Sequence, residues 1–147
     1  MNNLADLIVY FEQLKTDYEL LKTFVFGADE AVMNKLRADM TYPALILDLD
    51  KKFFDGNAEE GIYKFYSVFI SIVSWYGDGD ETAKTTETIK TEGIAEQILM
   101  RICLDFEIQP SEFEMFVIQR YEDNCIGWQL NVKLRSASTI CKDDNWL

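Results

Sequence analysis

Carboxylates that recur at short intervals are the residues of this chain best suited to chemistry. Asp48, Asp50 and Asp55 form one group, and residues 78–81 (DGDE) form another. Oxygen ligands of this kind bind Mg²⁺ or Ca²⁺. Neither group has the spacing of a metal-binding loop, and the second lacks the distal glutamate of a calcium loop in register. We therefore expect the polar face of a strand in the first case and a turn with a helix cap in the second, without a metal.

Nucleophilic and basic side chains form no catalytic pattern either. The chain has no histidine, which excludes every His-dependent triad and argues against zinc. Cys103, Cys125 and Cys141 are widely spaced with no CxxC pair, so we expect reduced thiols. Lys64 stands alone in an apolar stretch, either as a desolvated amine or, as we favour, as a side chain that reaches solvent at a strand end. No glycine-rich phosphate loop follows any expected strand. The sequence predicts a protein that is not an enzyme and needs no cofactor.

The charge balance restricts the partners. The 147 residues carry a net charge of −12, from 26 acidic and 14 basic residues. Phosphate backbones repel such a chain, so we expect no sequence-specific binding of nucleic acid. The acidity serves solubility, a basic partner, or a lumen that DNA passes without sticking. No apolar run has the length of a membrane span, and the first residues lack the basic region of a secretion signal, so we expect a cytoplasmic protein with no membrane contact.

The elements that would position any site are arranged around residues 61–76 (GIYKFYSVFISIVSWY). This stretch is rich in β-branched and aromatic residues and carries one charge, which predicts a long strand. Because both of its alternating faces are mostly apolar, we expect a central strand that is covered on two sides. One cover is the chain's own helices. The other is either a thick intramolecular core or a second subunit.

The rest of the chain supplies helices and further strands. Three- and four-residue apolar spacing predicts helices over residues 4–21 and 81–106, with a shorter helix over 28–40. Strands are expected over residues 22–27, 42–50, 112–122 and 125–135, and a turn over 51–60. The fold class is therefore α+β: a mainly antiparallel sheet of four to five strands, with helices packed on one face, in α-β-α-β-β-α-β-β order. We expect a single domain over residues 1–147, in which 136–147 form a C-terminal tail.

Large apolar residues on the two long β-segments are the candidate interface. A sheet with few covering helices does not hide two apolar faces by itself, so assembly is expected to bury one of them. The candidate interface residues are Tyr63, Phe65, Phe69, Trp75, Phe116, Ile118, Trp128 and Trp146.

Three segments resemble a known group of proteins. They are residues 24–27 (FVFG), residues 41–48 (TYPALILD) and the C-terminal hairpin with Gly127-Trp128. Together with the order of elements along nearly the whole chain, they are similar to the phage and prophage tail-terminator and neck (head–tail completion) structural proteins. The motifs are short and non-catalytic, and the chain after Arg135 matches no part of the pattern.

The resemblance implies an α+β subunit that assembles into a ring, often a hexamer, at the end of a tail tube or at the head–tail junction. Such a ring docks to other tail or connector proteins, stops tube growth and joins tail to capsid. A function from another class stays open: a monomeric acidic cytoplasmic module of the immunity type, which neutralises a basic protein partner. The mass in solution separates the two, because a ring needs several copies. An enzyme that uses the acidic cluster with a metal is the third and least favoured function.

Overall fold

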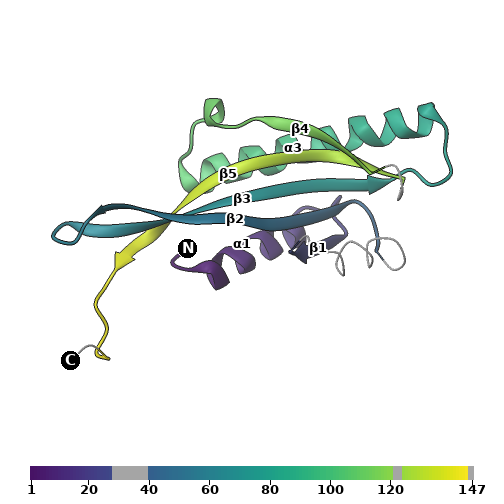
Figure 1. Ribbon diagram of the computed structural model, residues 1–147. Coiled ribbons are helices and arrows are strands. Elements are labelled where there is room, and N and C mark those ends of the chain that lie inside the picture. Colours follow the sequence, from purple (N-terminus) through teal and green to yellow (C-terminus); the bar gives the residue numbers. More distant parts are fainter. Residues whose placement is uncertain (28–39, 121–123, 146–147) are drawn as a thin grey trace.

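Residues 61–75 form the middle strand of a five-stranded sheet, as their composition predicts (Figure 1). The computed structural model describes residues 1–27, 40–120 and 124–145. The strand order is β1-β2-β3-β5-β4, in which β1 is parallel to β2 and all other neighbours are antiparallel. The bounds are β1 Thr23–Phe26, β2 Ala44–Asn57, β3 Gly61–Trp75, β4 Met115–Arg120 and β5 Cys125–Ile140.

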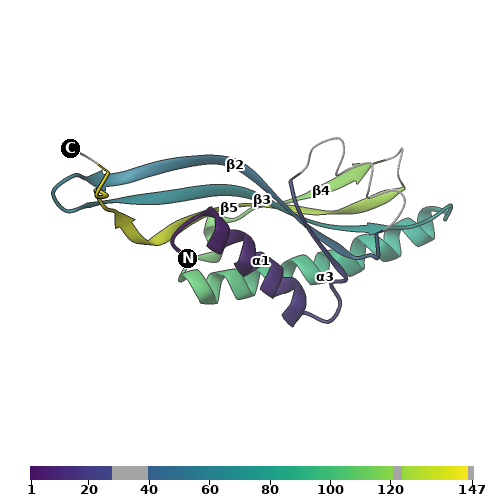
Figure 2. The same ribbon diagram turned by 90° about the horizontal axis from the view of Figure 1, so that it is seen from below.

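Two long helices lie on the same face of this sheet (Figure 2). They are α1 (Leu4–Asp17) and α3 (Glu81–Phe106), and a short 3-10 turn, η1 (Pro110–Glu112), follows α3. The side chain of Asn3 caps α1 by accepting the N–H of Asp6 at 2.9 Å. Asp80 caps α3 by accepting the N–H groups of the next turn at 3.1 Å. Both caps satisfy amides that a helix start leaves without a partner.

The core lies between the helices and one set of alternating strand residues. From β3 it takes the even-numbered residues Tyr66, Val68, Ile70 and Ile72, all of which are buried. They meet the apolar stripes of both helices and the matching residues of β2 and β5. Each fully buried side chain of this size contributes about 1.5–3 kcal/mol to folding. The expected α+β class with helices on one face is therefore confirmed.

Two strands extend further than the sequence pattern indicates. The turn expected over residues 51–60 is wrong, because Lys51–Asn57 continue β2 and only residues 58–60 turn. Asn57 closes this turn by accepting the N–H groups of Glu59 and Glu60 at 2.9 and 2.8 Å. The expected tail over 136–147 also begins too early, because β5 runs to Ile140. The sequence pattern misses both extensions because the apolar alternation is interrupted, by charged residues in β2 and by small polar residues at the end of β5.

An irregularity in β5 explains why its last residues look like a tail. The pairing of β5 with β3 shifts between Tyr63 and Phe65, which leaves extra residues in β5. Ser136 fills the gap: its buried hydroxyl accepts the N–H of Lys64 at 3.2 Å and donates to the carbonyl of Ser138 at 2.7 Å. The chain start is tied to the same place through the N–H of Ala137, which donates to a carbonyl of the first residue. The helix expected over residues 28–40 lies, except for Met40, outside the described residues.

Candidate interaction surface

The face of the sheet away from α1 and α3 is the main candidate site, and we call it the open face. No helix within residues 1–27, 40–120 and 124–145 covers it (Figure 2). One part of it is nevertheless buried by the chain itself: Ile46, Val73 and Cys125 form a second apolar cluster, against which Val25, Met40, Tyr42 and Ile118 pack. Strand partners share a face, so the odd-numbered residues of β3 fix its membership. Its residues include Ile46, Asp48, Lys51, Phe53 and Asp55 of β2, Tyr63, Phe65, Ser67, Phe69, Ser71 and Val73 of β3, Gln129, Asn131, Lys133, Arg135 and Thr139 of β5, and Phe116 and Ile118 of β4.

A polar strip crosses the centre of the open face. Asp50 is the extra residue of a bulge in β2, and its carboxylate lies 3.1 Å from the hydroxyl of Ser67. The same hydroxyl is 3.3 Å from the amide oxygen of Asn131. One hydroxyl proton serves one acceptor, so an Asn131 amide turned to present its NH₂ satisfies both contacts. The polar groups of this strip therefore satisfy one another across three strands.

Beyond the helices, β2 and β3 continue as a projecting hairpin (residues 51–65), which we call the arm (Figure 1). Rings stiffen its open-face side: Phe53 stacks on Phe65 with ring centres 5.0 Å apart. The guanidinium of Arg135 lies 4.7 Å from the centre of the Tyr63 ring. On the other side, Phe54 is 56% exposed. Cation–π contacts at exposed sites contribute about 0.5–1 kcal/mol each. Pairing of β5 with β3 as far as Ile62 adds a third strand at the base of the arm.

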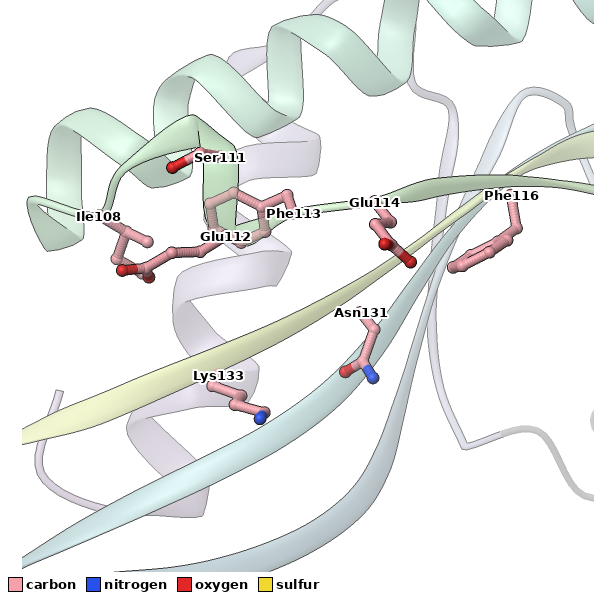
Figure 3. Close-up of a pocket in the computed structure, with 8 residues that line it drawn as sticks. All are labelled: Ile108, Ser111, Glu112, Phe113, Glu114, Phe116, Asn131 and Lys133. Atoms are coloured by element: carbon pink, nitrogen blue, oxygen red, sulfur yellow. The ribbon is translucent and has the colours of Figure 1, made fainter.

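A groove lies at the start of β4, beside the part of β5 that extends past it (Figure 3). β4 pairs with β5 only as far as Leu130, so the edge of β5 beyond that residue has no β4 partner. The groove has a volume of about 480 Å³, with Asn131 and Lys133 on the β5 side. The opposite wall comes from the segment after α3 and from β4, and consists of Ile108, Ser111, Glu112, Phe113, Glu114 and Phe116. This mixture of rings and opposite charges suits contact with a protein segment.

The structure divides the predicted interface residues. Tyr63, Phe65, Phe69, Phe116 and Ile118 all lie on the open face, although strands far apart in the sequence supply them. One further candidate, the Trp at position 75, lies at the end of β3 and is 54% exposed. The last candidate, at position 146, lies outside the described residues.

Trp128 lies on the opposite, helix-covered face. Its ring packs against the core, and its indole N–H donates to the carbonyl of Thr88 in α3 at 3.1 Å. The chain's own helix therefore accounts for the burial of Trp128 without a second subunit. The alternation of β5 had already put Trp128 on the same side as Leu130 and Val132, which was the signal that could have excluded it.

The side chains considered for chemistry have structural partners. The Lys64 ammonium donates to the carbonyl of Asn2, so it ties the arm to the chain start. Burial, with a contribution from Glu112, raises the pKa of the Cys103 thiol. Within the described ranges, His, Cys, Asp and Glu form no group of three that could hold a metal. The arm was missed because charged residues interrupt the apolar alternation of β2, and the groove was missed because it depends on β5 continuing past the first residue of β4.

The open face, the arm and the groove together make up the candidate interaction surface of the described residues. In the part of the chain that the structure describes, no helix is long and apolar enough to cross a membrane. Comparisons with known proteins add no relative: neither a protein-family model nor a curated protein matches this chain.

Proposed function

We propose that this protein is a non-enzymatic structural subunit that assembles with copies of itself through the open face and the arm. In this proposal it forms a ring of the tail-terminator or neck type in a phage or phage-like tail, and docks there to tail or connector proteins. The observation that carries the proposal is the open face itself. Five predicted aromatic and aliphatic residues converge on it, and the projecting arm continues it.

Charge favours a second copy as the occupant of this surface. The arm itself is neutral, with three basic and three acidic residues, and the adjoining part of β5 (residues 131–140) adds Lys133 and Arg135 without an acidic residue. The whole chain has a net charge of −12, so the remainder is strongly acidic. The two β5 cations at the base of the arm attract the acidic body of another copy, and contacts between opposite charges set both orientation and encounter rate.

An arm-to-body contact is heterologous, because it joins two different patches. Contacts of this kind propagate from copy to copy and close into a ring when the rotation between neighbours divides a full turn. The function is then mechanical: the closed ring presents one surface to the tail tube and another to the connector. An acidic ring wall would also let DNA pass without binding to it.

The experiment that tests the proposal is the mass in solution, by light scattering and native mass spectrometry, for three forms of the full chain. The wild type is expected to form a closed oligomer that weakens as salt rises. Phe65→Glu places a charge on the open-face side of the arm and is expected to give monomers. Phe54→Glu is the matched control, because it changes an exposed ring on the other side of the same arm and should leave the oligomer intact.

A wild type that stays monomeric at about 0.1 mM, at both low and physiological salt, would contradict self-assembly. Equal loss of the oligomer in the Phe65→Glu and Phe54→Glu variants would contradict the assignment to the open face. The net charge favours a second function in the monomeric case: an acidic module that binds and neutralises a basic protein.

A further inference from the structure

The outer edge of β2 along the arm has no strand beside it. β1 pairs with β2 only from Ala44 to Leu47, and β3 occupies the inner edge. In the described part of the chain, residues 51–57 therefore have one neighbour strand, and Figure 2 shows β2 as the outermost strand of the arm. Their side chains are exposed, except for the half-buried Phe53. The amides and carbonyls of such an edge are a template for pairing with another strand.

The sequence of this edge is complementary to itself. Residues 51–55 read KKFFD, with the basic residues at one end and the acidic residue at the other. Consider an antiparallel pair with the same segment of a second copy, centred on Phe53. Lys51 then lies directly opposite the partner's Asp55, and the two-fold axis repeats this pair on the other side of Phe53. Both side chains are on the open-face side of β2, as residues that face each other across antiparallel strands must be.

The other side of the same strand is complementary as well. In this register Lys52 lies opposite the partner's Phe54. The two residue types already attract each other within one chain, where the Lys52 ammonium lies 5.6 Å from the centre of the Phe54 ring. At the axis Phe53 meets its own copy, and stacking on Phe65 already holds its ring in place. Aromatic pairs and opposite charges are the cross-strand pairs that stabilise a sheet.

The charges select this register over its neighbours. In a two-fold antiparallel pair, the residue at the axis faces its own copy. An axis at Lys51, Lys52 or Asp55 would therefore set like charges opposite each other. An axis at Phe54 would set Lys52 opposite Gly56 and form no charge pair within residues 51–55. The register centred on Phe53 has two opposite-charge pairs and no like-charge pair.

The second bare edge of the sheet lacks this property. β5 continues past Leu130 without β4, but its residues 131–140 include Lys133 and Arg135 and no acidic residue. Two copies of that edge would bring together cations without a partner in the strand. The outer edge of β2 is therefore the edge suited to a second copy of itself.

We propose that the arms of two copies pair through the outer edges of their β2 strands, antiparallel and centred on Phe53. The contact is isologous and gives a two-fold dimer. It does not rest on the proposed function, because it uses a strand edge and not the open face. Phe54→Glu places a carboxylate opposite the partner's Lys52, so the contact survives in that variant. Since few residues take part, the dimer is weak and forms at high protein concentration.

Cross-linking tests the register. Lys51→Cys and Asp55→Cys are made in separate full chains in which the exposed Cys141 is replaced by serine. Opposed residues of antiparallel strands have Cα atoms about 4.5–5.5 Å apart, which a disulfide can bridge. A mixture of the two chains at about 1 mM is expected to give a mixed disulfide dimer on mild oxidation. Each chain alone should give little, because the two copies of one position lie about 13 Å apart.

A charge swap measures the affinity, by sedimentation equilibrium at physiological salt in a Phe116→Glu background. That background charges the open face on β4 and leaves the arm unchanged. Lys51→Asp and Asp55→Lys each set like charges opposite each other twice, so each should weaken the dimer about fivefold or more. The double variant restores opposite pairs and should return to within about twofold. Glu59→Lys is the control, because it changes the net charge as Asp55→Lys does but lies in the turn.

Three results would overturn the proposal. They are a mixture that forms no mixed disulfide, single chains that cross-link as well as the mixture, and a double charge variant as weak as the single ones. A wild type that forms rings without the mixed disulfide would leave the proposed function standing and remove this contact. A mixed disulfide in a chain that forms no ring would do the reverse.

Discussion

Replacement of Trp128 by phenylalanine should destabilise the monomer without changing its assembly. Trp128 joins β5 to the N-terminal half of α3, where threonines dominate and helix propensity is low. The change removes the indole N–H that donates to Thr88 and leaves space where the larger ring packed against the core.

The magnitude follows from these two losses. A net hydrogen bond contributes about 1 kcal/mol. Full truncation of a core tryptophan costs about 3–5 kcal/mol, so truncation to phenylalanine costs roughly 1–2 kcal/mol. The sum is about 2–3 kcal/mol. A chain of 147 residues has an unfolding entropy of about 0.3 kcal/mol per degree, so the melting temperature should fall by about 6–10 °C.

Urea denaturation, followed by circular dichroism, measures the loss, and hydrogen exchange locates it. Amides in the first half of α3 should exchange faster, because two contacts fasten this half to the sheet: the Trp128 bond and the 2.6 Å bond from Ser74 to Glu87. Trp75→Phe is the control, with an expected change within about 0.5 kcal/mol since Trp75 is more than half exposed. A Trp128→Phe protein of unchanged stability but altered mass in solution would refute the reasoning and make Trp128 an interface residue.

Three further predictions concern single contacts. The pKa of Tyr10 is raised by burial and by its 2.8 Å bond to Asp105, so the folded state holds the phenol proton above pH 10, where the unfolded chain releases it. The stability advantage of wild type over Tyr10→Phe should therefore be full below pH 10 and shrink as pH rises above it, by at most about 1.4 kcal/mol per pH unit in urea titrations; a constant difference would contradict this. Gly127→Ala should cost about 3 kcal/mol or more in the same assay, because the new Cβ would lie 1.8 Å from the backbone oxygen of Ile72, which cannot rotate away; a loss below about 1 kcal/mol would show that the strands separate easily. Ser136→Ala should cost about 1–3 kcal/mol, because it leaves an N–H of β3 and a carbonyl of β5 without their partner; unchanged hydrogen exchange at the base of the arm would argue against that role.

Much of the fold could be predicted because local signals and long-range pairing agree. Residues 61–75 are central, as their two apolar faces indicate, and Asp80 caps α3 as its position before an acidic turn indicates. The errors occur where local composition opposes a tertiary contact. The composition around Lys51 predicts a turn, but pairing with β3 keeps these residues in a strand.

The candidate site was predictable as a set of residues but not as a shape. Alternation along β3 correctly puts Tyr63, Phe65 and Phe69 on one face, because strand periodicity is a local property. Which face the helices cover is decided by all strands at once, so Trp128 was assigned to an interface although it packs inside. The bulge at Asp50 and the unequal lengths of β4 and β5 leave no sequence pattern of their own.

The order of strands has a consequence for how the chain acquires its structure. A short hairpin turn joins β3 to its neighbour β2. The other neighbour of β3 is β5, which comes later in the chain, after α3 and β4. Contacts between segments so far apart in the sequence form slowly, because a long loop must close first. Until β5 has been synthesised, the backbone groups on that edge of the apolar strand β3 have no partner, and the same strand of another nascent chain could pair with them. Synthesis at low temperature or with a chaperone should therefore raise the soluble yield more than any change to the finished surface.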